Sequence, residues 1–408
     1  MSADIVVIGS GFAARQLVKN IRHLDKNVPI RIIAADSCDE YNKPELSHVF
    51  SMGYRAEALT RQAAADWAES QNIMLHPFTV VSCIDTAAHI ITTSAGDYIY
   101  GKLVLATGAE AIVPEIEGSD LIFTLNSQQE YRRYDKALID AHQILIVGGG
   151  LIGTELAMDF NRAGKAVTVM DRSNSLLSTL LPPEISARLQ NRLMNNGVEF
   201  MFRHELIQVS RHNDLLEASF SNGQRKTFDA VVCAIGLRPN LTLAKSGGIK
   251  TRRGIVVDDT LATSVADVYA LGDCAEIQGK PMPYLQPAAL AAMTLAKNLT
   301  GHNAKLMLPA MLIKIKTPDM PLQLAGDPAN AAYHWEMALS PAGIIAEGRD
   351  EDGALRAFVV SEDHMKLAFS MLKDIKLLGT SFGIELKAKA GENRPVWCKQ
   401  NRRFIKRK

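Results

Sequence analysis

Short runs of aliphatic and β-branched residues recur along most of the chain, and helical patterns separate them. The first run, residues 4–8, leads into a glycine turn and a helix, and the next apolar run ends in Asp36. The same order returns where residues 143–147 lead through a second glycine turn and helix to a strand at 166–170 and Asp171. Two such strand–turn–helix–strand units predict two doubly wound α/β domains on parallel sheets.

The rest of the chain predicts further strands, and after Pro309 the predicted strands become shorter. Apolar runs predict strands at 103–106, 230–234 and 268–271, and a helix at 288–299. After Pro309 we expect shorter strands at 311–316, 333–339, 343–347 and 354–360, followed by a helix at 362–373. The predicted fold class is therefore α/β, with two doubly wound dinucleotide-binding domains and a small α+β C-terminal domain.

Composition narrows the class of protein. A chain of 408 residues is too long for one typical core, and 47% hydrophobic with 22% charged residues is ordinary for a globular protein. We find no apolar run of membrane-spanning length and no secretion signal at the N-terminus, so no membrane association is expected. The five cysteines are scattered and never form a C-x-x-C pair, which favours a reducing, cytoplasmic setting over a disulfide framework or a metal site.

Charge is distributed unevenly. Residues 376–408 hold ten Lys or Arg against Glu385 and Glu392, a net charge of +8, so the rest of the chain carries −7 of the total +1. An acidic body is not expected to bind nucleic acid. The tail, 377–408, is interpreted as an extension without fixed structure, with a basic arm for an acidic partner as the alternative.

Both glycine turns have the spacing that binds a dinucleotide pyrophosphate. The first glycine makes the tight turn, the second lets the backbone approach the phosphates, and the third position keeps helix and strand close. The two sets are Gly9, Gly11 and Ala14, then Gly148, Gly150 and Gly153.

An acidic residue closes the strand after each turn, and it indicates which nucleotide binds. A carboxylate there accepts hydrogen bonds from a ribose diol and repels a 2′-phosphate. Asp171 therefore favours NADH over NADPH, although Arg172 beside it leaves NADPH as an alternative.

Three further motifs complete a family resemblance. The chain resembles the two-dinucleotide-domain pyridine nucleotide:flavin reductases, in the rubredoxin reductase branch, and is most similar to the reductases that serve flavorubredoxin. The resemblance spans residues 1 to about 375 and implies a glutathione-reductase-like fold. It rests on residues 105–109, 234–240 and 268–275, with closer likeness at 39–44, 125–131 and 314–318. The expected parts are an FAD-binding domain at 1–111 and 240–308, an NADH-binding domain at 112–239, a C-terminal domain at 309–376 and the tail.

The resemblance implies that FAD is the resident cofactor and NADH a substrate. Asp36 would hold the adenosine ribose, Lys43 would approach the FAD phosphate and ribose, Val81 would meet the adenine, and Asp273 would bind ribityl or phosphate hydroxyls. The other implied cofactor contacts are Gly9, Ser10, Gly11, Phe12, Ala14, Thr107, Gly108, Gly148, Gly150, Gly153, Asp171, Gly236, Gly272 and Leu285.

Two charged residues are expected near the flavin. The resemblance places Glu155 between flavin and nicotinamide, and brings Lys316 to the isoalloxazine from the C-terminal domain. Alternation with the neighbouring isoleucines puts Lys314 and Lys316 on one face, which fits a surface strand equally well. His48 stands where many relatives have lysine, either as a pH-sensitive group near the flavin or as a packed or surface histidine.

No cysteine pair is available to attack a disulfide, so electrons are expected to leave the flavin directly. No residue is assigned as nucleophile or general base, because the cofactor supplies the chemistry. The implied acceptor is flavorubredoxin or a rubredoxin-like carrier, and the pathway is anaerobic nitric oxide detoxification. Alternatives are a ferredoxin reductase of an oxygenase system, an NADH oxidase on the same scaffold, and a flavin- or nucleotide-sensing interaction protein.

Overall fold

The computed structural model describes residues 4–375, and by its internal contacts the chain divides into two compact units. Unit 1 combines residues 1–141 with 232–308, and unit 2 combines residues 142–231 with 309–408. The tail predicted at 377–408 and Cys398 lie outside the described residues. The domain boundaries expected from the sequence remain a prediction.

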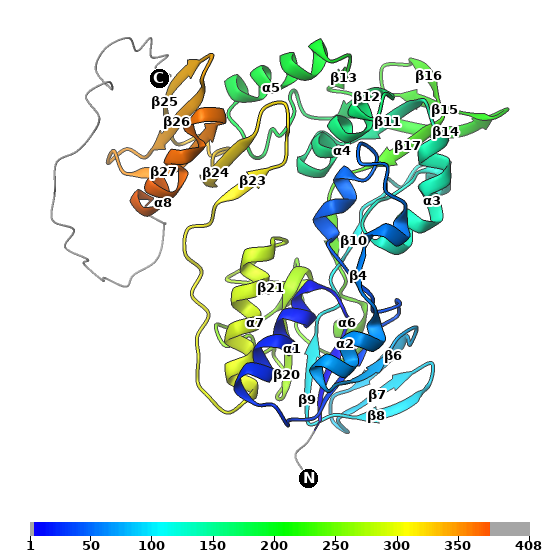
Figure 1. Cartoon of the computed structure of the whole chain (residues 1–408), viewed down its shortest axis with the longest axis vertical. Helices are drawn as coiled ribbons and strands as arrows, with labels where there is room; N and C mark the ends of the chain where they lie inside the picture. The colour runs from blue at the N-terminus through cyan, green and yellow to red at the C-terminus, as the bar shows by residue number, and fades with distance from the viewer. Residues whose placement is uncertain (1–3, 376–408) are drawn as a thin grey trace. The chain divides into compact units, whose positions relative to one another are not determined.

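Unit 1 is built on a five-stranded parallel sheet (Figure 1). Its strand order is β20 (Val268–Ala270), β9 (Lys102–Leu105), β1 (Ile5–Ile8), β2 (Ile30–Ile33) and β5 (Met74–His76). β1 is central because it pairs with β2 along one edge and with β9 along the other, where Ile5 lies opposite Ile30 and Lys102. All of its residues are buried. A strand buried on both faces requires a continuous apolar run, which is what residues 5–8 supply.

Helices cover this sheet, and smaller sheets attach to it. α1 (Phe12–Leu24) packs along α7 (Leu285–Leu299), with Leu17, Val18 and Ile21 in the same core as Leu295. The other helices of unit 1 are α2 (Ala64–Gln71), α3 (Gln128–Asp140) and α6 (Thr242–Ser246), with 3-10 turns η1 (Lys43–His48), η2 (Ala56–Leu59), η3 (Ser119–Leu121) and η4 (Gly272–Cys274). The smaller sheets are β3 (Glu40–Tyr41) with β4 (Thr60–Gln62), β6 (Val81–Asp85) with β7 (Ile90–Thr93) and β8 (Gly96–Ile99), β10 (Ala109–Ala111) with β18 (Leu237–Pro239), and β19 (Ile255–Val256) with β21 (Ala275–Ile277) and β22 (Lys280–Pro281).

Unit 2 begins with a second sheet of the same kind. The order is β13 (Glu199–Phe202), β12 (Ala166–Asp171), β11 (Gln143–Val147) and β17 (Ala230–Cys233), and β11, β12 and β13 run parallel. Its helices are α4 (Leu151–Arg162) and α5 (Pro183–Asn195). An antiparallel sheet of β14 (Leu206–His212), β15 (Leu215–Phe220) and β16 (Arg225–Phe228) follows. This hairpin sheet, like the β6–β8 sheet of unit 1, was not predicted.

The C-terminal part of unit 2 is an antiparallel sheet with a helix. The strand order is β23 (Ile313–Ile315), β24 (Leu322–Gly326), β27 (Leu355–Ser361), β26 (Gly343–Arg349) and β25 (His334–Ser340). Its small core joins Ala325, Phe358 and Val360 to Ala368 and Met371. The small α+β domain is confirmed, and β24 is an additional strand.

One predicted helix has a different form. Residues 362–373 were expected to make a single α-helix, but the segment starts as a 3-10 turn, η5 (Glu362–Leu367), and becomes α8 (Ala368–Asp374). Glu362 has a φ of +50°, outside the helical region, so a regular α-helix cannot begin there. Among residues 4–375, no helix is both long and apolar enough to cross a membrane.

Candidate functional site

The first glycine turn forms an open cradle at the start of α1. Gly9 has a φ of +113°, and a Cβ there would overlap the Ala106 carbonyl oxygen, so this position requires glycine. Gly11 has no described atom within 4 Å of where a Cβ would lie. It caps α1 without a side-chain hydrogen bond, and the first turn holds no acidic residue. The uncapped N–H groups and helix dipole fit a pyrophosphate.

Asp36 lies beside this turn, as predicted for a ribose-binding carboxylate. Its Oδ1 accepts hydrogen bonds from the Ser10 hydroxyl at 2.7 Å and the Cys38 amide at 3.0 Å. Within residues 4–375 the exposed Oδ2 has no hydrogen-bond donor, so it can accept from a sugar diol. Val81 is buried at the start of β6. The hydrogen bond between Ser10 and Asp36 therefore links two residues that were both predicted to contact the cofactor.

A desolvated pair of opposite charges lies in unit 1. Burial lowers the pKa of the Lys43 ammonium group, while the carboxylates of Asp273 and Glu130 act against that change. Burial likewise raises the pKa of Asp273, with Lys43 opposing. Both directions show that desolvation outweighs the mutual attraction of the two charges. Such groups are stabilised when a polar ligand supplies further hydrogen bonds, which fits the phosphate and hydroxyls of a dinucleotide.

Packing brings Asp273 to the first glycine turn. Gly272, with a φ of +78°, lies so close to α1 that a Cβ there would be 2.8 Å from the Cβ of Ala13.

The remaining predicted contacts of unit 1 lie in loops and at a helix start. Thr107 donates its hydroxyl to the Asn240 carbonyl at 3.2 Å. Gly108 and Gly236 both have positive φ, and Leu285, the first residue of α7, is 45% exposed.

His48 and Glu130 add to the surroundings of Lys43. The Nε2 atom of His48 is buried without a hydrogen-bond partner among the described groups. Glu130 accepts from the Asn126 amide at 2.7 Å, while Ser127 caps α3 by accepting from the Glu130 amide. The role of Glu130 was missed, although the Ser-x-x-Glu pattern at 127–130 is a recognisable helix-capping signal.

The second glycine turn repeats the first in unit 2. Gly148 has a φ of +112°, and Gly150 caps α4 with open space around its Cβ position. The Gly149 amide donates to Asp171 Oδ2 at 2.5 Å, and the Ser173 amide donates to Oδ1 at 2.7 Å. These bonds fix the carboxylate beside the turn, where a nucleotide ribose would bind. Gly153 is buried within α4, as close helix–strand packing requires.

Arg172, the residue after Asp171, forms an ion pair with a different carboxylate. Arg172 has a 78% exposed side chain and pairs with Glu205 at 3.9 Å. A pair this exposed and long is weak, so it does not fix the guanidinium strongly.

Glu155 connects α4 to the C-terminal domain. It is 5% exposed, and its Oε1 accepts a hydrogen bond from the Lys316 backbone amide at 3.0 Å. Lys314 and Lys316 are both exposed, as the strand alternation predicted. No sequence pattern indicated the amide contact, because 161 positions separate the two residues.

Three arginines strengthen this connection within unit 2. Arg192 lies 3.1 Å and Arg188 3.6 Å from the carboxylate of Glu362. Arg192 also donates to the Asp319 carbonyl at 2.5 Å, and Arg162 pairs with the Asp319 carboxylate at 3.7 Å. α4 and α5 therefore contact the C-terminal domain through Asp319 and Glu362. None of these residues was predicted.

Three of the four described cysteines are unsuited to thiol chemistry. Burial raises the pKa of Cys38 to about 12, and it also raises the pKa values of Cys233 and Cys274. Cys83 is exposed, and none of these four cysteines is in a disulfide. Because the thiolate is the reactive form, the three buried thiols are inert at neutral pH.

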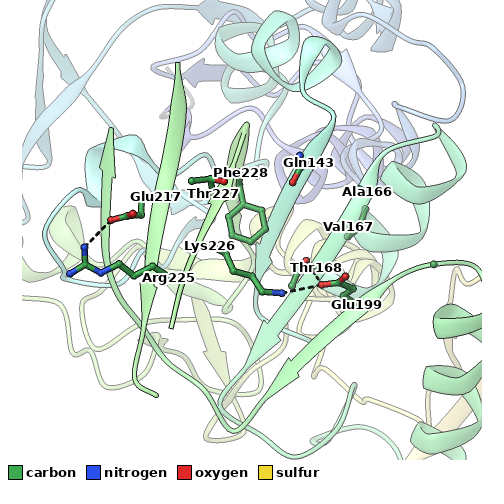
Figure 2. Close-up of a pocket in the computed structure, with 11 residues that line it drawn as sticks. Gln143, Ala166, Val167, Thr168, Glu199, Glu217, Arg225, Lys226, Thr227 and Phe228 are labelled. Carbon is green, nitrogen blue, oxygen red and sulfur yellow. Dashed lines mark hydrogen bonds and ion pairs between the residues drawn. The ribbon is translucent and has the colours of Figure 1, made fainter. Parts of the chain in front are cut away.

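Figure 2 shows a pocket of about 440 Å³ in unit 2 that lies apart from these residues. It is lined by Gln143, Ala166 and Glu199, which begin β11, β12 and β13, whereas the glycine turn follows the carboxyl end of β11. Its charges are already paired, Lys226 with Glu199 at 3.1 Å and Arg225 with Glu217 at 3.2 Å. In open parallel sheets ligands bind at the carboxyl ends, so we exclude this pocket from the site.

Comparison with known proteins agrees with this geometry. Residues 3–293 match the family described as pyridine nucleotide-disulphide oxidoreductase, and residues 305–375 match the rubredoxin binding C-terminal domain. A protein of Escherichia fergusonii named nitric oxide reductase FlRd-NAD(+) reductase is 54% identical over 377 residues, covering 92% of this chain and 100% of that protein. A namesake in Escherichia coli O6:K15:H31 is equally similar over the same coverage.

Solved structures share the fold at low sequence identity. A ferredoxin reductase from Rhodopseudomonas palustris superposes with a TM-score of 0.83 at 23% identity, covering 92% of this chain and 95% of that one. An NADH:rubredoxin oxidoreductase from Clostridium acetobutylicum gives 0.76 at 23% identity, with the same coverage. The predicted glutathione-reductase-like fold is confirmed. With its two glycine turns and rubredoxin-binding C-terminal domain, the chain belongs to the pyridine nucleotide-disulphide oxidoreductase family.

Proposed function

We propose that this protein is an FAD-dependent NADH oxidoreductase that passes electrons to the rubredoxin-type iron centre of flavorubredoxin, in nitric oxide detoxification. The observation that carries the proposal is the likeness, at 54% identity over their full length, to reductases bearing the name nitric oxide reductase FlRd-NAD(+) reductase. The rubredoxin binding domain at 305–375 supports the same class of acceptor.

The residues of unit 1 would hold FAD. The uncapped start of α1 at Gly11 would receive the pyrophosphate, and Asp36 Oδ2 would accept from the adenosine ribose. Lys43 and Asp273 would gain the polar partners that their burial denies them. When bound, FAD supplies hydride acceptance from NADH and one-electron donation to an iron centre.

The residues of unit 2 would orient NADH. Asp171, aligned by the Gly149 and Ser173 amides, would bind the ribose diol and disfavour a 2′-phosphate. The buried carboxylate of Glu155 stands in the second turn of α4, past the glycines that would receive the pyrophosphate. It would position the nicotinamide end while its bond to Lys316 ties it to the C-terminal domain.

The exposed lysines of β23 would guide the carrier. Lys314 and Lys316 lie in the domain that matches rubredoxin-binding proteins, and they add positive charge to an otherwise acidic body. Opposite charges raise association rates and are screened by salt. The three buried, inert cysteines favour a protein acceptor over a disulfide substrate.

Stopped-flow spectroscopy with the FAD-loaded protein, NADH and an isolated rubredoxin domain tests the proposal. We expect rapid flavin reduction followed by carrier reduction, with a KM for the carrier that rises with salt. Lys314→Gln should raise that KM and leave flavin reduction by NADH unchanged. The matched control is Lys366→Gln, an exposed lysine of the same domain. Flavin reduction without carrier reduction would reject the proposed acceptor.

A further inference from the structure

A second, unassigned pocket opens in unit 1 between α1 and α2 (both labelled in Figure 1), and it is strongly basic. Its volume is about 620 Å³, within the size range of small-molecule sites. Five cationic or titratable residues line it against one carboxylate, that of Glu40; they are Arg15, Lys19, Arg22, His23 and Lys26. This excess stands out because the chain outside residues 376–408 carries a net charge of −7.

Part of this positive charge has no ion-pair partner. Among the described residues, no carboxylate lies within ion-pairing distance of Lys19, His23 or Lys26. The Arg22 guanidinium donates to backbone carbonyls, those of Gln71 at 2.6 Å and of Val28 and Asn72 at 2.9 Å. Burial lowers the pKa of Arg22, and the nearby carboxylate of Asp25 opposes that change.

Arg15 lies at the opposite end of the pocket and is 8% exposed. It stacks 3.9 Å above the Trp67 ring and donates to the Cys38 carbonyl at 2.5 Å. Its Nη1 has no hydrogen-bond partner among the described groups, only a 3.7 Å ion pair with Glu40. Burying a guanidinium with an unsatisfied nitrogen is unfavourable unless an anion nearby offsets the charge.

We propose that this pocket binds a small molecule of nucleotide size that bears two or more phosphate groups. Lysine and arginine around a recess are suited to phosphate oxygens, which accept several charge-assisted hydrogen bonds. The amides of Gln16, Gln62, Gln71 and Asn72 supply donors and acceptors for a sugar or base. A recess of about 620 Å³ between two helices has the size of a small-molecule site, whereas a protein partner would bury a much larger surface.

Isothermal titration of ADP into the full-length, FAD-loaded protein tests this proposal. Saturating NAD+ is present throughout, so that the nucleotide turn at Gly148 is already filled. We expect saturable one-to-one binding of ADP, which inorganic pyrophosphate displaces. Lys19→Gln with Lys26→Gln should weaken ADP binding about tenfold, because two charges are lost from the pocket wall.

Lys136→Gln with Lys245→Gln is the matched control, since it removes two exposed lysines of unit 1 outside the pocket and should change ADP binding less than about twofold. The proposal is overturned if the NAD+-saturated protein shows no saturable ADP binding, or if the control variant loses as much affinity. Failure of pyrophosphate to displace ADP would also overturn it. A pocket variant that only raises the KM for the carrier would identify a protein-docking surface instead.

Discussion

Single residues of this protein owe their chemistry to burial as much as to type. Asp36 follows β2 and Asp171 ends β12, each as the acidic residue of its strand–turn–helix–strand unit, yet their hydrogen-bond partners differ. The Oδ1 atom of Asp36 accepts both of its hydrogen bonds, from the Ser10 hydroxyl and the Cys38 amide, whereas each carboxylate oxygen of Asp171 accepts one backbone amide. Cys38 and Cys83 have the same side chain, but only Cys38 is buried, so their reactivity differs.

The cysteine environments predict a selective labelling pattern. In a Cys398→Ser background at pH 8, a thiol reagent should modify Cys83 rapidly and leave Cys38, Cys233 and Cys274 unmodified in the native protein. The raised pKa of Cys38 stabilises the fold below the ordinary pKa of 9.0, a contribution lost as the pH rises toward about 12. Mass spectrometry of Cys83→Ser should show no fast-reacting site. Fast labelling of Cys38 in that variant would contradict the buried thiol.

Asp171 predicts the nucleotide preference. Asp171→Asn removes the negative charge, so repulsion of a 2′-phosphate should fall, while one side-chain oxygen remains to accept from either the Gly149 or the Ser173 amide. We expect the ratio of kcat/KM for NADPH to that for NADH to rise about tenfold or more, measured from initial rates of flavin reduction. Asp214→Asn, an exposed carboxylate in the same unit, should leave the ratio unchanged.

At the scale of elements, the glycine turns show how a few positions set a local structure. The expected strands at 4–8 and 143–147 agree with β1 and β11 within one residue, and a glycine turn and a helix follow each strand as expected. They were predictable because each turn needs glycine at a positive φ and an uncapped helix start, and both requirements produce a recognisable glycine spacing in the sequence. The unpredicted β6–β8 and β14–β16 sheets lack such marks, since short half-exposed strands alternate weakly.

The two glycines of the first turn should respond differently to alanine. Gly9→Ala places a Cβ against the Ala106 carbonyl at a positive φ and should lower the stability of the flavin-free protein by more than about 2 kcal/mol. Gly11→Ala meets open space at a φ of −68° and should cost less than about 1 kcal/mol.

Flavin binding separates the two variants further. The Gly11→Ala methyl group would occupy the space proposed for the pyrophosphate, so FAD affinity should fall although the fold is kept. Denaturant unfolding of the flavin-free proteins and equilibrium FAD titration provide the two measurements. Unaltered FAD affinity in Gly11→Ala would argue against the assigned cradle.

At the scale of the whole molecule, unit 2 joins a nucleotide-binding sheet to the rubredoxin-binding domain. The joining contacts are the Glu155–Lys316 hydrogen bond and the arginine pairs to Glu362 and Asp319. Each ion pair is partly exposed and worth about 1 kcal/mol or less on its own. Together they fix the orientation of the domain that carries Lys314 and Lys316.

Glu362→Gln should therefore affect the carrier more than NADH. The variant loses the charge that pairs with Arg188 and Arg192, so the KM for the rubredoxin domain should rise a few-fold while flavin reduction by NADH stays the same. Steady-state kinetics with varied carrier and stopped-flow flavin reduction measure the two effects. Glu351→Gln, an exposed carboxylate of the same domain, is the control. Slower flavin reduction by NADH in Glu362→Gln would contradict an effect limited to the carrier.

The amino-acid pattern alone was enough to predict the two parallel-sheet domains, the glycine turns and the acidic residues that accompany them. Each of these depends on residues within one strand–turn–helix–strand unit, so composition and spacing reveal it. The folded arrangement was needed to learn that Lys43 is desolvated near Asp273, that Glu155 accepts from the Lys316 amide, and that Arg188 and Arg192 pair with Glu362. These partners are more than a hundred positions apart, and their distances depend on how the sheets pack, which leaves no local periodicity in the sequence.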